Sequence, residues 1–127
     1  MCLDNLKDKK EFIAKAEKAK RGYIYAYSTA VKRQDDKYWP VFNCKEPYKD
    51  GWNVSECKEE IEVRDSADEY IPYFHRYIYK QTARKRIKGW KQRIVFKWLV
   101  PIKDITAAGM NGGRTIVCRR CYLIGEV

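Results

Sequence analysis

Residues 105–124 read ITAAGMNGGRTIVCRRCYLI, and this stretch contains the strongest turn signal in the chain. Asn111 and Gly112 both tolerate the positive φ values of a type I′ turn, and β-type residues flank them on either side. The stretch therefore predicts a hairpin of two strands, over residues 105–110 and 115–124. Strands joined by so short a turn run antiparallel, so we expect a mainly antiparallel sheet.

The chain before this hairpin contains four more predicted strands and two predicted helices. Residues 93–100 alternate, with their apolar side chains facing one way, and Pro101 ends the strand. Pro40 cannot donate a ladder hydrogen bond, which places its strand at a sheet edge. Asp8 is a suitable N-cap for the first helix. The predicted strands are 23–31, 38–42, 71–79 and 93–100, and the predicted helices are 8–21 and 80–89.

Together these elements predict one domain over residues 1–127. Its fold class is α+β, with two helices packed on a mainly antiparallel sheet of five to six strands. A chain of 127 residues can bury roughly two-thirds of the surface that it exposes when unfolded, which is enough for one core. Residues 43–69 are the least regular part, and no linker or internal repeat divides the chain.

The net charge of +10 is unevenly distributed. Residues 70–103 contain ten basic residues and no acidic one, whereas residues 45–69 contain nine acidic and four basic residues. Such a basic region raises the local concentration of anions and speeds their encounter with the protein. The partner classes to consider are therefore nucleic acids, nucleotides and anionic membranes.

The composition favours a cytoplasmic protein, in a bacterial cytosol or an infected host cell. Five cysteines are an odd number, which free thiols in a reducing compartment explain most simply. No apolar run approaches the roughly eighteen residues that a membrane span needs. The polar N-terminus does not resemble a signal peptide, so we expect no membrane partner.

The first candidate binding residues lie on the predicted strand 71–79. Tyr73, Phe74, His75 and Arg76 combine rings that can stack on a base with a cation that can pair with phosphate. Strand alternation places Tyr73 and His75 on one face and Phe74 and Arg76 on the other. The alternative is that about half of these rings belong to the core.

The second candidate group is the predicted basic helix. Lys80, Arg84 and Lys88 repeat every four residues, and like charges at this spacing repel by about 0.2–0.5 kcal/mol per pair. An anion bound there would relieve the repulsion. The alternative is a solvated face whose charge only keeps the protein soluble.

The third candidate group is the turn itself. At Asn111 and Gly112 the backbone is open to a close ligand, and the Arg114 guanidinium can hold a phosphate with two hydrogen bonds. We expect Arg114, near an exposed hairpin tip, to serve ligand binding more than folding. The alternative is a hairpin turn without further function.

Neither a metal or cofactor site nor a catalytic site is predicted. Cys118 and Cys121 form a Cys-x-x-Cys, but residues three apart in a strand point to opposite faces and could not share a metal without a bend. No phosphate-binding loop, metalloprotease motif or nucleophile elbow occurs. His75, the only histidine, would need a carboxylate partner to act in acid–base catalysis. We therefore expect a binding protein and not an enzyme.

The order of several short motifs is similar to that in small proteins carried by phages and prophages. Across residues 10–124 the chain most resembles the first Thoeris anti-defence family, the sponge proteins. The resemblance implies an oligomeric protein that sequesters a cyclic ADP-ribose-type immune messenger, or a cyclic oligonucleotide, without cleaving it. The motifs concerned are Tyr73-Phe74-His75, the basic helix, the strand before Pro101, residues 104–109 and residues 116–120.

Two other functions remain open from the residues alone. The basic residues 76–103 could bind a polynucleotide backbone, as in a nucleic-acid-binding inhibitor or regulator of the anti-CRISPR kind. Alternatively, scattered carboxylates could make the chain a hydrolase of cyclic nucleotide messengers, although their spacing gives no catalytic pattern.

Overall fold

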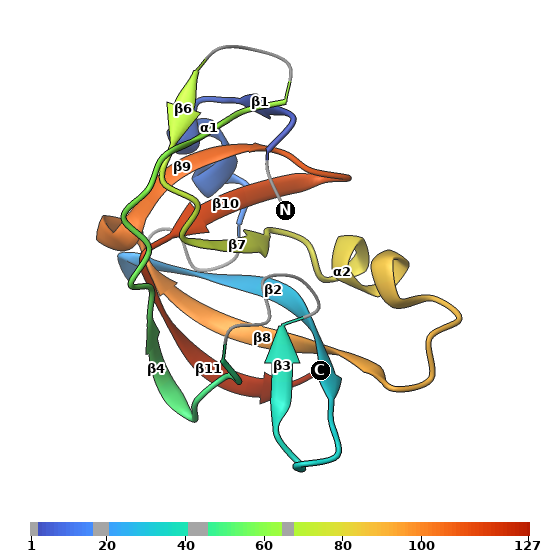
Figure 1. Cartoon of the computed structure of the whole chain (residues 1–127). Coiled ribbons are helices and arrows are strands. Elements are labelled where there is room, and N and C mark those ends of the chain that lie inside the picture. The colour runs from blue at the N-terminus through green and yellow to red at the C-terminus, as the bar shows by residue number, and fades with distance from the viewer. Residues whose placement is uncertain (1–2, 17–20, 41–45, 65–67) are drawn as a thin grey trace.

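The computed structural model describes residues 3–16, 21–40, 46–64 and 68–127 (Figure 1). The helices and strands of these residues, with their bounds, are β1 (Asn5–Leu6), α1 (Lys9–Ala14), β2 (Tyr23–Lys32), β3 (Tyr38–Pro40), β4 (Gly51–Val54), β5 (Ile61–Glu62), β6 (Glu69–Tyr70), β7 (Phe74–Tyr77), α2 (Lys80–Ile87), β8 (Arg93–Pro101), β9 (Ile105–Met110), β10 (Arg114–Cys118) and β11 (Arg120–Glu126), together with a 3₁₀ turn over Ile102–Asp104.

Nine of these strands form one antiparallel sheet, in the order β1-β9-β10-β7-β2-β8-β11-β4, with β3 paired to β2. β5 and β6 form a separate two-stranded sheet. The predicted α+β class, the antiparallel sheet and the two helices are confirmed. The predicted count of five to six strands is wrong, because short strands such as β1 and β4 carry too few residues for a clear period-2 pattern.

The sheet curls strongly at the end of the predicted hairpin. Pairing of Arg114 with Met110 confirms the hairpin of β9 and β10. The predicted type I′ turn is wrong, because three residues, 111–113, connect the strands and Gly112 has a positive φ (+71°) whereas Asn111 does not. The second predicted strand, 115–124, is wrong in one respect: it is two strands that pair with different neighbours. β10 pairs with β9 and β7, whereas β11 pairs with β8 and β4. A hydrogen bond from the Arg119 amide to the Asp104 carbonyl (2.9 Å) holds the bend between them.

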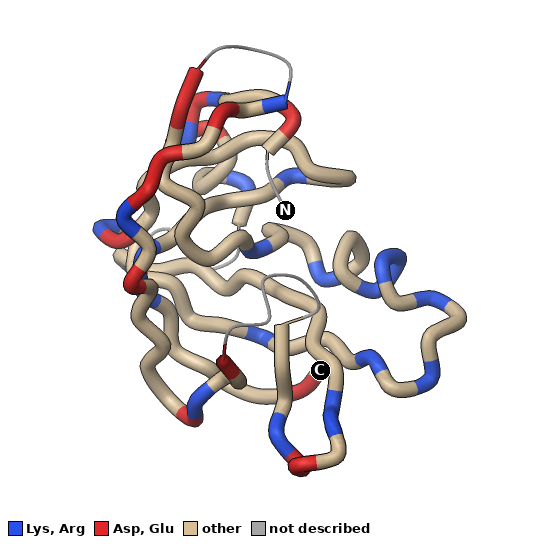
Figure 2. The backbone as a smooth tube through the Cα atoms, in the orientation of Figure 1, with Lys and Arg blue, Asp and Glu red and all other residues tan. Residues whose placement is uncertain are grey.

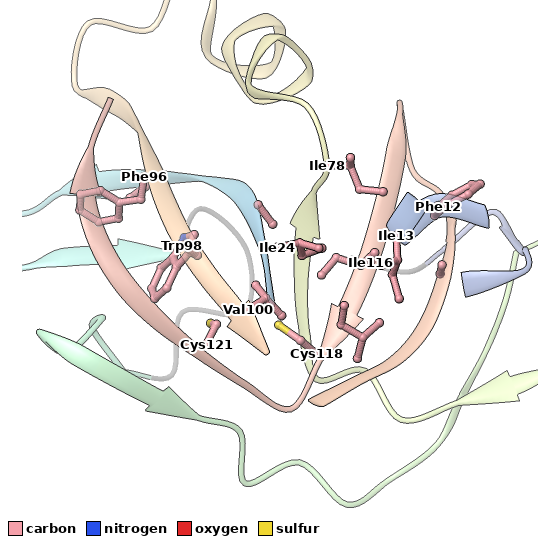
Figure 3. Close-up of a cluster of buried hydrophobic side chains, with 14 residues drawn as sticks. Phe12, Ile13, Ile24, Ile78, Phe96, Trp98, Val100, Ile116, Cys118 and Cys121 are labelled. Carbon is pink, nitrogen blue, oxygen red and sulfur yellow. The ribbon is translucent and has the colours of Figure 1, made fainter. Parts of the chain in front are cut away.

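The main core lies on the inner face of this curl (Figure 3). Ile24 of β2, Trp98 of β8 and Ile116 of β10 are all fully buried there. Phe12 and Ile13 of α1 cover the β9–β10 side of the cluster. Burial of each aliphatic side chain of this kind stabilises the fold by about 1.5–3 kcal/mol.

α2 packs on the outer face of the same sheet. Ala83 is fully buried against Tyr27 of β2, Tyr77 of β7 and Val95 of β8, and Ile87 borders this cluster. The basic side chains of α2 point away from these contacts and are mostly exposed. The sheet is thus covered by α2 at one end only, which matters for the outer surface described below.

The first helix is shorter than predicted. Asp8 caps it as expected, because its carboxylate accepts a hydrogen bond from the Lys10 amide (2.9 Å). The helix ends at Ala14, so the prediction of residues 8–21 is wrong in extent, and residues 17–20 lie outside the described part of the chain. The second helix agrees with the prediction of residues 80–89 to within two residues, and Gly89 follows it at φ +85°.

Of the strand predicted over residues 38–42, Tyr38–Pro40 form β3, which pairs with β2 as an edge strand, and residues 41 and 42 lie outside the described residues. The strand predicted over residues 71–79 is β7, of four residues only, because Pro72 cannot donate to a ladder. Among the described helices, none has both the length and the apolar character needed to span a membrane.

Candidate functional site

The ten residues predicted to bind ligand fall into two places: a pocket at β7, and α2 with the adjoining β9–β10 turn. Tyr73, Phe74, His75 and Arg76 line one pocket. The three basic residues of α2 lie outside that pocket, and so do the three residues of the β9–β10 turn. The four residues of the predicted aromatic strand therefore share one pocket. The other six predicted residues lie outside this pocket. These six are Lys80, Arg84, Lys88, Asn111, Gly112 and Arg114.

The pocket has a volume of about 430 Å³, within the range of ligand-binding cavities. Three parts of the chain line it: β7 with the residues before it, the middle of β2, and the segment that enters and leaves β4. Acidic side chains reach it only at Glu46 and Glu56, which are exposed.

Tyr48 forms one wall of the pocket and is fixed by Asn53. The Asn53 side chain is buried; its Oδ1 accepts a hydrogen bond from the Lys49 amide (3.0 Å), and its Nδ2 donates to the Lys49 carbonyl (2.8 Å). The turn that these bonds stabilise holds the Tyr48 ring edge-on to Trp98, with 5.0 Å between ring centroids. Trp98 is anchored in turn by its Nε1, which donates to the Ser28 hydroxyl (2.8 Å).

Arg76 is the decisive residue of the pocket. Only 3% of its surface is exposed, and its guanidinium carbon lies 4.3 Å from the Trp98 ring, 4.9 Å from the Phe74 ring and 5.3 Å from the Tyr48 ring. Its Nη1 donates to the His75 carbonyl (2.8 Å), but Nε and Nη2 are buried without a hydrogen-bond partner among the described residues. None of the ion pairs in this part of the chain involves it.

A buried guanidinium without a counter-ion is unfavourable. Desolvation of an ion costs several kcal/mol, and aromatic faces return only about 2 kcal/mol of it. Burial acts to lower the pKa of Arg76, but the neighbouring Tyr48, Cys121 and Cys118 side chains outweigh burial and raise that pKa. The Cys121 sulfur is close enough to contribute to this shift, but it makes no hydrogen bond of normal geometry with Nε or Nη2. The group therefore keeps its charge. Two unused donors on a permanent cation in a pocket wall are suited to a carboxylate or a phosphate.

Cys118 and Cys121 both lie beside Arg76. Strand alternation predicted instead that they point to opposite faces of the sheet. The bend at Arg119 turns both side chains into the main core, where both are fully buried. Burial raises the pKa of Cys118 well above its usual range. For Cys121 burial acts in the same direction, but the hydrogen bond with Cys118 and the charge of Arg76 outweigh it and lower the pKa. No cluster of three metal-ligating side chains occurs in the described ranges.

His75 is held in the fold as a neutral ring. Its Nε2 lies 2.7 Å from the Tyr70 hydroxyl, which accepts a hydrogen bond from the Leu3 amide (2.8 Å). Burial, together with the Arg76 charge, lowers the pKa of His75 from 6.5 to about 4. At neutral pH the ring is therefore uncharged, and its Nε2 accepts a hydrogen bond from the Tyr70 hydroxyl. This arrangement makes His75 a structural residue and a poor general acid.

The predicted turn residues pack against α2. Arg86 Nη2 donates to the Asn111 carbonyl (3.0 Å), and a side chain at Gly112 would collide with this guanidinium. Arg114 is not a free hairpin-tip residue, as the sequence suggested, because its guanidinium carbon lies 4.7 Å from the Phe12 ring centroid. Arg114 therefore has a packing partner in the core, and its Nη1 is buried without a hydrogen-bond partner among the described residues.

We expect Arg114→Ala to lower the free energy of unfolding by about 0.5–2 kcal/mol, the range of a cation–π contact. Affinity for a ligand of the Arg76 pocket should not change, because the two arginines line different parts of the fold. Thermal denaturation and calorimetric titration measure these effects, and Arg114→Lys should restore part of the stability. An unchanged melting temperature with weaker binding would support the role in ligand binding predicted from the sequence.

A second hollow is larger but less suited to specific binding. It has a volume of about 890 Å³ and lies between the β2–β3 hairpin and the α2–β8 connection. Most of its lining residues are exposed, and its two acidic residues already have partners: Asp35 accepts from Trp39 Nε1 (3.2 Å) and Asp36 pairs with Lys32 (3.5 Å). None of the buried donors without a partner lies in it.

Comparison with known proteins adds no relative. No family model matches the chain, and no curated protein or solved structure is significantly similar to it. The resemblance to the sponge family thus stays a prediction, and the pocket must be interpreted from its own chemistry.

Sequence reasoning missed the residues that complete the pocket around Arg76. Tyr48 and Asn53 lie in the segment that was expected to be irregular, and Trp98 was expected only as an apolar strand residue. One signal was present: Arg76 alternates with apolar positions on a short aromatic strand, where an arginine is rarely tolerated without a function.

Proposed function

We propose that this chain is a binding protein that holds a small, anionic, nucleotide-derived molecule in the Arg76 pocket without cleaving it. The observation that carries the proposal is the buried Arg76 guanidinium with two unused donors. A phosphate placed there would supply the missing counter-ion, and each charge-assisted hydrogen bond is worth about 1.5–3 kcal/mol. A bound anionic ligand would therefore provide the counter-ion that Arg76 lacks.

Aromatic walls support a nucleotide over a simple inorganic anion. Phe74, Tyr73 and Tyr48 line the same pocket as Arg76. Rings of this kind stack on a base or hold it edge-on, while its phosphate pairs with the cation. The volume of about 430 Å³ is also larger than one phosphate group needs.

The chemistry of the pocket argues against hydrolysis. His75 has its Nε2 engaged with Tyr70 and is uncharged at neutral pH, so it lacks the acidic proton of an imidazolium. Glu46 and Glu56, the acidic residues of the described pocket lining, are exposed to solvent and are not held against any other lining residue by a hydrogen bond, whereas a general acid must be positioned at the reacting group. These observations favour a binding protein over a hydrolase of the same molecules.

In the cell, a protein of this kind would act by lowering the free concentration of a messenger. The resemblance to phage sponge proteins suggests the biological role of this activity. The protein would act against bacterial immunity in the cytosol, by withholding a cyclic ADP-ribose-type or cyclic oligonucleotide signal from an immune effector. Oligomeric assembly belongs to the same proposal.

We expect the protein to bind cyclic ADP-ribose isomers or cyclic oligonucleotides and to return them intact. The purified protein is incubated with each compound and denatured by heat, and the released small molecules are identified by chromatography and mass spectrometry. Recovery of the unchanged compound in stoichiometric amount supports the proposal. New products would assign a hydrolase, and no retention of any anionic nucleotide would refute the proposed ligand class.

A further inference from the structure

The outer face of the sheet, opposite the Arg76 pocket, carries a line of three aromatic residues and one leucine across four strands. Tyr25 of β2 pairs with Leu99 of β8, Leu99 pairs with Tyr122 of β11, and Tyr122 pairs with Trp52 of β4. Directly paired residues point to the same face of a sheet, so these four side chains form one line about 14 Å long. We call this line the aromatic row.

The aromatic row is accessible. Trp52 is 44% exposed and Tyr122 is 41% exposed, although their rings contact each other edge-on at 5.3 Å. Val54 and Ile124 beside them are also exposed. α2 covers the same outer face over Tyr27 and Val95, and Tyr25 and Leu99 are half-buried, so the exposed part of the row is the pair Trp52 and Tyr122.

Cations accompany the rings. Lys97 Nζ lies 4.0 Å from the Tyr25 ring centroid, and the Arg120 guanidinium carbon lies 4.3 Å from the Trp52 ring. At the far end of the same face, α2 and the residues after it carry the basic side chains that Figure 2 shows in blue. The acidic residues, shown in red, gather mainly along the segment between β4 and β6, away from α2.

We infer that the aromatic row binds single-stranded nucleic acid, with bases stacked on the rings and phosphates drawn to the cations of α2. Sheets that bind RNA stack two or three unpaired bases on exposed aromatic residues, and the length of the row suits that number. A duplex hides the faces of its bases, so only single strands can use the rings. A nucleic acid is favoured as the occupant because its phosphates complement the net charge of +10.

This surface is independent of the proposed messenger pocket. Trp52 and Tyr122 lie on the outer face, whereas Asn53 and Cys121, their neighbours in sequence, point inward, where the core and the pocket lie. A variant of the outer face can therefore be tested while messenger binding is monitored on the same protein. Failure of either proposal leaves the other intact.

The test uses labelled oligothymidine of about 20 nucleotides and a duplex of equal length, titrated by fluorescence anisotropy. We expect the single strand to bind more tightly than the duplex. Tyr122→Ala and Trp52→Ala should each weaken single-strand binding about five- to a hundredfold, the worth of one stacked base. The matched control is Tyr79→Ala, since Tyr79 is 42% exposed but lies off the row, and it should change affinity less than twofold.

Two outcomes would overturn the inference. Equal affinity for single strand and duplex, unchanged in Tyr122→Ala and Trp52→Ala, would show that α2 binds phosphates without the rings. Absence of oligonucleotide binding, together with a dimer in sedimentation that Tyr122→Ala dissociates, would show that the row is an interface between two copies. Circular dichroism of each variant confirms that it is folded, which is expected because both residues lie at the surface.

Discussion

Replacement of Arg76 by methionine is expected to abolish ligand binding while the free protein becomes more stable. The ligand loses two charge-assisted hydrogen bonds, so its affinity should fall at least about a hundredfold. The free protein loses a buried cation that has no counter-ion, and apolar replacement of buried ions often stabilises a fold by about 1–4 kcal/mol. Binding and stability should therefore change in opposite directions, which a purely structural residue does not do.

Two measurements test this expectation for Arg76→Met. Isothermal titration with the ligand gives the affinity, and thermal denaturation gives the stability with and without ligand. The matched control is Arg84→Met on α2, an exposed arginine outside the pocket, which should leave both quantities nearly unchanged. If Arg76→Met unfolds the protein, or destabilises it by several kcal/mol, Arg76 braces the core and the proposed pocket loses its main support.

The second large effect is a loss of stability in acid that depends on His75. Its pKa is lowered from 6.5 to about 4 in the folded protein by burial. Between these two values the unfolded chain binds a proton that the folded chain does not, so stability falls as the pH falls. The contribution is fully present above pH 6.5 and is lost by about pH 4. A shift of this size corresponds to roughly 3 kcal/mol of unfolding free energy.

The pH dependence can be assigned to His75 by comparison with His75→Gln, whose side chain keeps an acceptor for the Tyr70 hydroxyl but does not titrate. Urea denaturation of both proteins at a series of pH values between 7 and 4 gives the two stability curves. Carboxylates contribute equally to both, so the difference between the curves isolates the histidine. Parallel curves would show that His75 is solvated and titrates normally, contrary to the buried contact with Tyr70.

Local signals in the sequence were sufficient for much of the fold. The Asn111-Gly112 signal, the alternation of residues 93–100 and the Asp8 cap each act within a few residues, and each correctly predicted that a hairpin, a strand or a helix forms there, although not the turn type or the length of the helix. The same is true of strand alternation around Arg76, which placed Phe74 and Arg76 on one face, as the contact between them shows. Such features depend on backbone geometry that neighbouring residues determine by themselves.

The bend at Arg119 could not be read from the sequence in the same way. Residues 115–124 have the β propensity of one continuous strand, and no glycine or proline interrupts them. The strand divides because the sheet must curl for its two arms to bury a common core, and that requirement exists only once β7, β2 and β8 are in place. The same bend brings Cys118 and Cys121 together, against the local expectation.

The sequence by itself determined the fold class, the hairpin, the uneven charge and an aromatic strand that contains a cation. The tertiary structure alone decided which of those cations lacks a partner. In the sequence, Arg76, Lys80 and Arg84 are three basic residues of the same basic region. Of these three only Arg76 is buried, because the curl of the sheet brings Trp98 and Tyr48 against it. Burial depends on contacts between residues far apart in the chain, and the cost of a charge depends on burial.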